Sequence, residues 1–258
     1  MTSTVKLEID AHVARVTLNR PDVANTLNLQ MGRDLLQAAL SCENDPAVRA
    51  VILTGEGRNF CFGGDLRGMM GEGGQVEAYL NELTTYLHAA IASFTRMSAP
   101  VIAAVNGTAA GAGVGLVAMA DLAVAGQSSK FALAYTGVGL TPDGSTSFLL
   151  PRVVGRKRAM ELFLTNRTLG AEEALAWGLV NQVVADETLL ETAGALATRL
   201  AAGPTAAFGA VKRLMLSADA GLESQMATEG RAIAAQAASP EGTEGINAFL
   251  EKRKPKFG

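Results

Sequence analysis

Short apolar segments that end at a glycine or a turn alternate with segments of helical spacing through the first two thirds of this chain. "RAVILTGEG" (49–57) and "APVIAAVNG" (99–107) are continuous apolar runs, as expected of strands that are buried on both faces. Residues 29–40 and 79–97 have helical spacing. One face of the first predicted helix carries Leu29, Leu35, Leu36 and Leu40. Strands that alternate with helices predict an α/β fold.

The last part of the chain has a different character. Residues 187–250 are almost wholly helical in pattern. No fixed-period repeat or low-complexity linker separates this part from the rest. We therefore predict a core over residues 1–200 and a helical region over residues 201–258.

Composition excludes several classes of protein. The 258 residues are 48% hydrophobic with a formal net charge of −3, and they show no basic stripe that would fit nucleic acid. Cys42 and Cys61 are too few for a disulfide framework and suit a reducing compartment. The polar start of the chain has no apolar signal region, and Asn106 and Asp121 interrupt the most hydrophobic segment. These features predict a cytoplasmic protein that does not contact membranes.

The segment "VNGTAAGAGVGL" (105–116) is unusually rich in glycine. It is not a dinucleotide fingerprint, because Leu116 occupies the third glycine position, and it lacks the lysine of a P-loop. One interpretation is close helix packing through Gly111 and Gly115. The other is a helix N-terminus whose free N–H groups face an oxyanion. "CFGGDL" (61–66) also follows an apolar strand and offers a second backbone donor for the same oxyanion.

Five motifs together resemble the crotonase (enoyl-CoA hydratase/isomerase) superfamily. They are "NRPDVANTLN", "NFCFGGDLRGM", "APVIAAVNGTAAGAG", "TPDGSTSFLLPRVVGRKRAMEL" and "EEALAWGLVNQVV". The resemblance runs from about residue 5 to residue 257 and keeps the order and spacing of the family. It implies a crotonase-like spiral of ββα units with a helical C-terminal part.

The resemblance also implies the chemistry of the site. It implies an enzyme that binds acyl-CoA and polarises the thioester carbonyl between the backbone amides of Gly64 and Ala112. Further contacts to the substrate or to its CoA part are implied at Ala24, Phe62, Gly63, Asp65, Leu66 and Gly111. Relatives use the C-terminal region for trimerisation and to cover the CoA site, so Lys252 and Lys256 are expected to meet the CoA phosphates as point charges.

Two residues of the family's hydratases are absent. Members that hydrate enoyl-CoA carry two glutamates, and this chain has Gly115 and Tyr135 at those positions. Adding water across a double bond needs an acid and a base around one water molecule. A standard hydratase is therefore disfavoured.

Asp143 and His88 take the place of the missing carboxylates. Taken alone, Asp143 is typical of a turn or a helix N-cap, and a lone histidine on a helix is usually structural. Within the resemblance, Asp143 matches the catalytic aspartate of phenylacetate-pathway ring-enoyl-CoA isomerases and the nucleophile of 4-chlorobenzoyl-CoA dehalogenase. His88 has the same offset from Pro100 as the dehalogenase's histidine, and it is expected to line the acyl pocket and to be available as a base. Tyr135 is expected to hydrogen-bond or shape the pocket beside Asp143.

The main hypothesis is therefore an isomerase that shifts a C=C bond from the 3,4 to the 2,3 position of an enoyl-CoA, with Asp143 carrying the proton. The alternative is an aryl- or acyl-CoA dehalogenase or hydrolase, with Asp143 as nucleophile and His88 as base. A hydratase and a non-catalytic acyl-CoA binder rank behind both. No metal and no tightly bound cofactor are expected, since coenzyme A arrives as part of the substrate. By analogy the protein is expected to form a homotrimer or a hexamer built from two trimers.

Overall fold

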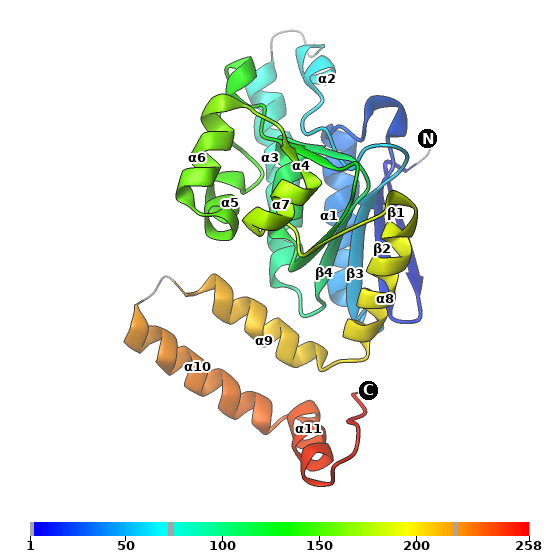
Figure 1. The fold of residues 1–258 in the computed structure, drawn as a ribbon, viewed down its shortest axis with the longest axis vertical. Coiled ribbons are helices and arrows are strands. Elements are labelled where there is room, and N and C mark those ends of the chain that lie inside the picture. The colour runs from blue at the N-terminus through cyan, green and yellow to red at the C-terminus, as the bar shows by residue number, and fades with distance from the viewer. Residues whose placement is uncertain (1–2, 72–74, 219–220, 258) are drawn as a thin grey trace.

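The computed structural model of the chain describes residues 3–71, 75–218 and 221–257. Its main sheet has six strands in the order β1-β2-β3-β4-β6-β9 (Figure 1). These strands are β1 (Val5–Asp10), β2 (Val13–Leu18), β3 (Ala50–Gly55), β4 (Val101–Val105), β6 (Leu122–Gly126) and β9 (Gln182–Val184). Only the β1–β2 pair is antiparallel, and the other four pairs are parallel.

A second sheet of three short strands gives the chain its spiral course. Its members are β5 (Thr108–Ala110), β7 (Lys130–Ala132) and β8 (Leu169–Gly170). From β4 the chain passes into β5 and then into helix α4 (Ala112–Met119), and β6 is followed in the same way by β7. After β3, Cys61 forms a parallel bridge with Ala109 of β5 before the chain enters helix α2 (Leu66–Met70). This succession confirms the predicted ββα spiral.

Helices cover both faces of the main sheet, which explains why β3 and β4 are buried along their whole length. On one face lie α1 (Leu29–Asn44) and α3 (Val76–Arg96), and on the other lies α8 (Leu189–Ala201) (Figure 1). Successive strand residues alternate between these layers, so that Leu53 packs in the larger core and Ile52 packs under α8. The predicted apolar face of α1 is partly wrong, because Leu40 is 38% exposed whereas Leu35 is fully buried.

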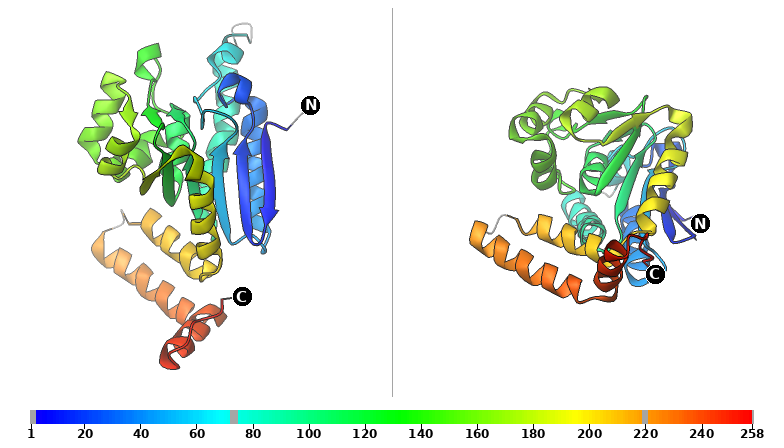
Figure 2. Two further views of the ribbon diagram at one scale, coloured as in Figure 1. Left: turned by 45° about the vertical axis from the view of Figure 1, so that its right-hand side comes forward. Right: turned by 60° about the horizontal axis from the view of Figure 1, so that its bottom comes forward.

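The remaining helices form two groups. Between β7 and β9 the chain folds into α5 (Thr146–Val154), α6 (Arg156–Thr165) and, after β8, α7 (Ala171–Trp177). After α8 come α9 (Thr205–Leu216), α10 (Leu222–Ala237) and α11 (Pro240–Leu250), which extend away from the sheets (Figure 2). This agrees with the helical pattern of residues 187–250, while the division into two domains at residue 200 stays a prediction. Within the described residues, no helix is long and apolar enough to cross a membrane.

Candidate active site

The two glycine-rich junctions that the sequence singles out lie against each other. Gly63 has a φ of +79°, and a β-carbon there would lie 2.9 Å from the carbonyl oxygen of Ala110 and 3.3 Å from the nitrogen of Ala112. The Cys61–Ala109 bridge joins the same two segments one step earlier in the chain. Glycine at position 63 therefore allows the two backbones to approach closely.

Two backbone N–H groups at this contact are free. Leu27 forms a parallel bridge with Gly64. In this bridge Leu27 N donates to Gly63 O at 2.7 Å and Asp65 N donates to Leu27 O at 2.9 Å, so the hydrogen bonds involve the two neighbours of Gly64. The N–H of Gly64 itself has no partner among the described residues. Ala112 is the first residue of α4, where a helix leaves its N–H groups unpaired. Both residues line one cavity. The predicted pair of donors is thus brought to one place.

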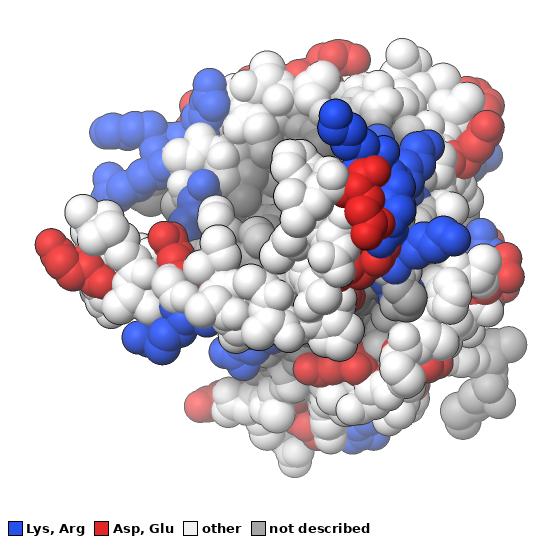
Figure 3. All heavy atoms as spheres, turned by 90° about the horizontal axis from the view of Figure 1, so that it is seen from below, with Lys and Arg blue, Asp and Glu red and all other residues white. Residues whose placement is uncertain are grey.

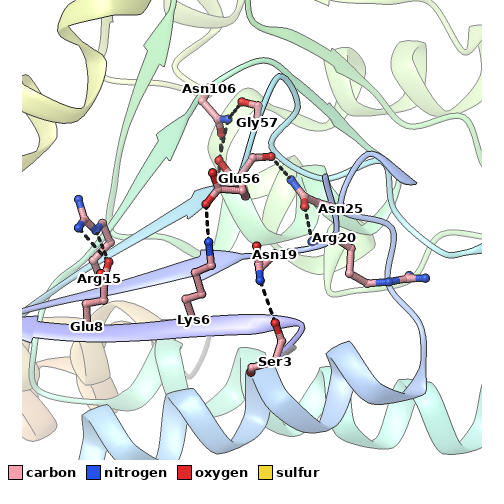
Figure 4. A network of polar contacts seen from close by, with 11 residues as sticks. Ser3, Lys6, Glu8, Arg15, Asn19, Arg20, Asn25, Glu56, Gly57 and Asn106 are labelled. Carbon is pink, nitrogen blue, oxygen red and sulfur yellow. Dashed lines mark hydrogen bonds and ion pairs between the residues drawn. The ribbon is translucent and has the colours of Figure 1, made fainter. Parts of the chain in front are cut away.

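A buried asparagine holds the segment that pairs with Gly64. Asn25 is fully buried, accepts from Arg20 N at 2.8 Å, and donates to Glu56 O at 3.0 Å and to Asn59 O at 2.7 Å (Figure 4). Its backbone and that of Ala24 are left-handed, with φ of 55° and 54°. The side-chain bonds stabilise this conformation, which residues other than glycine rarely adopt.

An ion pair ties the same segment to the Gly64 loop. Arg20 Nη2 lies 3.0 Å from Asp65 Oδ2, and Arg20 Nη1 donates to Thr26 O at 2.6 Å. Asp65 also caps α2 by accepting from Gly68 N at 3.0 Å. Burial opposes ionisation of Asp65, but the bonds from Gly68 and Arg20 outweigh it and hold the pKa of this carboxyl below its ordinary value.

Two glycines of the 105–116 segment serve packing. A β-carbon at Gly113 would lie 2.2 Å from Cys61 O, and one at Gly115 would lie 2.1 Å from Gly144 O. Helix α4 can therefore lie directly on the backbones of the Cys61 loop and of the loop that carries Asp143. The packing interpretation is confirmed at Gly115 and wrong at Gly111, where a β-carbon would lie 3.7 Å from its nearest neighbours; Gly113 takes that role instead. The interpretation as a helix N-terminus that faces an oxyanion stays a prediction, for which Ala112 presents a free amide.

The cavity beside the two amides has a volume of about 310 Å³, and we call it the acyl cavity. Its walls are mostly aliphatic, with Leu66, Met69, Leu83 and Val138 among them. Asp143 is the only carboxylate among the described residues that line it. A single acid–base group thus lies on the wall of an apolar cavity.

The backbone of Asp143 is anchored from two sides. Its carbonyl oxygen accepts from Tyr135 Oη at 3.0 Å, from Thr146 Oγ1 at 2.7 Å and from Thr146 N at 3.2 Å. The N-cap of α5 is Ser145, so the interpretation of Asp143 as a side-chain N-cap is wrong. The Asp143 carboxylate is left for other chemistry.

His88 contacts Asp143 from outside the acyl cavity. Its Nε2 lies 2.7 Å from Asp143 Oδ1, with the His88 and Asp143 side chains 53% and 35% exposed. The α3 residues that line the acyl cavity come earlier in the helix, and they include Leu83, Thr84 and Leu87. His88 instead lines a neighbouring cavity that shares Asp143 with the first. The prediction that His88 lines the acyl pocket is therefore corrected: it reaches the pocket through Asp143.

The other predicted contact residues fall into two sets. Phe62, Gly63, Leu66, Gly111 and Tyr135 line the acyl cavity. Ala24 and Asp65 lie next to it, since Ala24 O accepts from Phe62 N at 3.1 Å and Asp65 belongs to the Gly64 loop.

Lys252 and Lys256 are not brought to this cavity. They follow α11, which lies at the opposite end of the molecule from α2 (Figure 1). Within one chain the structure therefore does not unite them with the site.

Sequence reasoning missed three residues that support the site, namely Arg20, Asn25 and Thr146. Arg20 and Asn25 belong to "NRPDVANTLN", which served above only as a family motif, without a role for its side chains. The bonds from Arg20 to Asp65 and from Asn25 to Glu56 O span more than thirty residues, so local pattern carries no signal for them. Among the described residues, no group of three His, Cys, Asp or Glu side chains is placed to hold a metal ion.

Comparison with known proteins gives concordant results. The family model for enoyl-CoA hydratase/isomerase matches residues 8–258. The 1,2-epoxyphenylacetyl-CoA isomerase of Escherichia coli K12 is 39% identical over 266 residues, covering 100% of this chain and 99% of that protein. The 4-chlorobenzoyl coenzyme A dehalogenase-2 of an Arthrobacter species is 37% identical over 250 residues, covering 96% and 91%.

A solved structure agrees with these relatives. The crystal structure of an enoyl-CoA hydratase from Mycobacterium smegmatis superimposes with a TM-score of 0.91 at 37% identity, covering 98% of each chain. Each of these matches spans almost the whole chain. The protein therefore belongs to the enoyl-CoA hydratase/isomerase family, the crotonase superfamily that its motifs resemble.

Proposed function

We propose that this enzyme is an enoyl-CoA isomerase that converts a 3-enoyl-CoA to the 2-enoyl-CoA. The observation that carries the proposal is Asp143, the only carboxylate among the described residues of the acyl cavity, which also contains the free amides of Gly64 and Ala112. A proton shift beside a thioester needs one base and a stabilised enolate oxygen, and these groups supply both.

In this mechanism the thioester oxygen accepts hydrogen bonds from the Gly64 and Ala112 amides. The Asp143 carboxylate takes a proton from Cα, the electrons move into the enolate, and a proton returns to the chain at Cγ. Each amide is worth about 10²–10³ in rate in comparable oxyanion holes. The aliphatic walls favour an apolar acyl group, and no tightly bound cofactor has a role.

Residue 115 argues against hydration. The resemblance places one hydratase glutamate at Gly115, where any β-carbon would lie 2.1 Å from Gly144 O. The other glutamate position is Tyr135, whose hydroxyl donates to the Asp143 backbone. The pair of carboxylates that would hold a water molecule has no place in this site.

The test is proton exchange in D₂O with 3-hexenoyl-CoA, comparing wild type with Asp143→Asn. We expect the wild type to form the 2-enoyl isomer. The Asp143→Asn variant should still bind hexyl-CoA, a thioether, while its turnover falls by orders of magnitude. Binding without turnover in the wild type would overturn the proposal.

The 2.7 Å contact between His88 and Asp143 favours a second candidate, a dehalogenase or hydrolase. Here an Asp143 oxygen attacks the carbon that bears the leaving group, halide departs, and water activated by His88 hydrolyses the resulting ester. With 4-chlorobenzoyl-CoA, His88→Gln would then accumulate a covalent aryl ester on Asp143, with the mass of the substrate less its chlorine. The absence of that mass, together with isomerase turnover, would exclude this candidate.

We further propose that the protein works as a homotrimer or as a hexamer of two trimers in the cytoplasm. In such an assembly Lys252 and Lys256 of one chain would meet the CoA of a neighbour's site. The C-terminal helices support this proposal, because no described residue of α10 is buried within the chain. Sedimentation velocity tests it, and a monomer at micromolar concentration would contradict it.

A further inference from the structure

A second cavity lies beside the acyl cavity. It has a volume of about 540 Å³ and lies between the C-terminal half of α3, the Asp143 loop and α5. The α3 residues that line it are His88, Ile91, Ala92, Thr95 and Arg96. We call it the second cavity.

The two cavities share Asp143 but not His88. Asp143 lines both, whereas among the described residues His88 lines only the second. The hydrogen bond between His88 Nε2 and Asp143 Oδ1 therefore connects the carboxylate in the acyl cavity with a ring in the second cavity. The other ring nitrogen, Nδ1, has no partner among the described residues, and half of the His88 side chain is exposed.

The second cavity is suited to water. Its polar side chains include Thr95, Arg96 and Ser147, in addition to the pair of His88 and Asp143. A cavity of this size with several polar partners holds water, whereas an aliphatic cavity excludes it. The acyl cavity, once filled by an apolar acyl group, offers Asp143 no comparable access to solvent.

We infer that the second cavity is a water site that connects Asp143 with solvent through His88. This inference rests on the proposed isomerase. In the resting enzyme the bond between His88 and Asp143 uses the tautomer with the proton on Nε2, because a carboxylate can only accept. Once Asp143 has taken the Cα proton, proton exchange with water in the second cavity converts His88 to the tautomer with the proton on Nδ1. The proton of Asp143 then passes to Nε2 while Nδ1 releases its own proton to a water molecule. The reverse sequence returns a solvent proton to Asp143 and then to Cγ. No group is oxidised or reduced, and the proton placed on Cγ comes from solvent.

The route has a consequence for the alternative chemistry as well. If Asp143 forms an ester, water that His88 activates must reach that ester from the second cavity, because the acyl group fills the first. The second cavity thus supplies water in either reaction. In the isomerase the water carries protons, and in the dehalogenase or hydrolase it is the nucleophile.

The test that needs no turnover is chemical labelling of His88 with diethyl pyrocarbonate. His12, the only other histidine of the chain, is an internal reference. We expect His88 to stay reactive when hexyl-CoA saturates the acyl cavity, as judged by calorimetry. Ala92→Leu, which narrows the second cavity, should slow labelling of His88 several-fold relative to His12.

The matched control is Ala78→Leu, an identical change at an exposed position of α3 that lines neither cavity. It should leave labelling unchanged. Ala92→Val serves as a smaller obstruction if Ala92→Leu melts at a lower temperature than the control. Protection of His88 by hexyl-CoA, or equal labelling in Ala92→Leu and Ala78→Leu, would overturn the inference.

Turnover in D₂O separates this inference from the proposed function. We expect wild-type product to carry deuterium at Cγ and the Ala92→Leu product to carry less. Isomerisation that retains the original proton in the wild type would overturn the relay and leave the isomerase standing. Absence of isomerisation would overturn the proposed function, and the labelling result would still decide whether the second cavity gives access to His88.

Discussion

A β-carbon at Gly115 would collide with the carbonyl oxygen of Gly144, the residue next to Asp143, whose carboxylate the proposed chemistry uses. The absent side chain therefore has two effects. It removes a carboxylate that hydration needs, and it lets α4 support the Asp143 loop. In the proposed mechanism, the choice of reaction and the placement of the Asp143 carboxylate depend on the same residue.

Tyr135 is the residue whose role is easiest to isolate. Tyr135→Phe removes one of three bonds to Asp143 O and leaves both Thr146 bonds in place. A buried neutral hydrogen bond contributes about 1 kcal/mol, so we expect kcat to fall about three- to tenfold with little change in KM. Steady-state kinetics with a 3-enoyl-CoA measures the effect. A loss as large as that of Asp143→Asn would instead make Tyr135 a participant in proton transfer.

The pH profile gives an independent measure of Tyr135. Burial raises the pKa of the phenol above its ordinary value, and the nearby Asp143 charge adds to this. Because a raised pKa keeps the phenol protonated to higher pH, the Tyr135 hydroxyl remains a hydrogen-bond donor up to at least about pH 10. Any alkaline decline of kcat between pH 8 and about pH 10 should therefore be the same in wild type and Tyr135→Phe. Disappearance of that decline in the variant would contradict this assignment.

At the scale of elements, the Gly64 donor depends on a loop that is distant in sequence. The segment that carries Arg20 and Asn25 pairs with the Gly64 loop through Leu27. Partly buried polar bonds hold this segment, and Figure 4 shows those between Asn25 and Arg20 and between Asn25 and Glu56. The loop has no regular sheet of its own to fix it. Its rigidity, and with it the direction of the Gly64 amide, comes from these side chains.

Asn25→Ala should therefore affect both stability and the donor. It removes the Asn25 partner from three partly buried backbone groups, and we expect a loss of about 2–3 kcal/mol in the free energy of unfolding. The infrared stretch of a bound, ¹³C-labelled thioester carbonyl should also shift back toward its value in water, and kcat should fall about tenfold or more.

Asn19→Ala is the control in the same segment, because Asn19 donates to Ser3 O at 2.9 Å and not to the Gly64 side of the loop. We expect it to cost less than about 1 kcal/mol and to leave the carbonyl stretch unchanged. An unshifted carbonyl in Asn25→Ala would show that Asn25 supports the fold but not the donor.

At the scale of the whole molecule, one buried ion pair fastens the C-terminal helices to the core. Lys212 of α9 lies 2.7 Å from Asp121 and donates to Phe94 O at 3.0 Å and Ala99 O at 3.1 Å. Burial lowers the pKa of Lys212 and raises that of Asp121, so desolvation works against both charges. The other two C-terminal helices, α10 and α11, expose large apolar side chains. The surface of the molecule seen from below is mostly uncharged (Figure 3).

Lys212→Met should leave the Asp121 carboxylate without its cation; its side chain is 26% exposed and keeps Val101 N as a donor. We expect a loss of about 1–3 kcal/mol in the free energy of unfolding, measured by urea denaturation. The double variant Lys212→Met/Asp121→Asn should recover a large part of it, since the uncompensated charge is then gone. Equal losses in the single and the double variant would show that Lys212 acts through its carbonyl contacts alone.

The alternation of strands and helices and the two glycine-rich junctions could be predicted from local periodicity and spacing. The ββα spiral and the proposed role of Asp143 came instead from the resemblance to the family, because Asp143 taken alone is typical of a turn or a helix N-cap. Buried strands read as apolar runs, and glycine marks close backbone approach wherever it occurs. The same locality explains the error at Leu40, since spacing defines a helix face but not how far a neighbouring element extends over it.

Only the tertiary structure decided which groups meet. It joined His88 to Asp143 across 55 residues, placed that histidine in a separate cavity, and put Asn25 behind the Gly64 donor. It also left Lys252 and Lys256 at the far end of the chain's own fold. The sequence by itself determines where helices and strands form, because the preferences that set them act between residues that are close in the chain. The pairing of side chains follows from how those elements pack, and no local pattern records that.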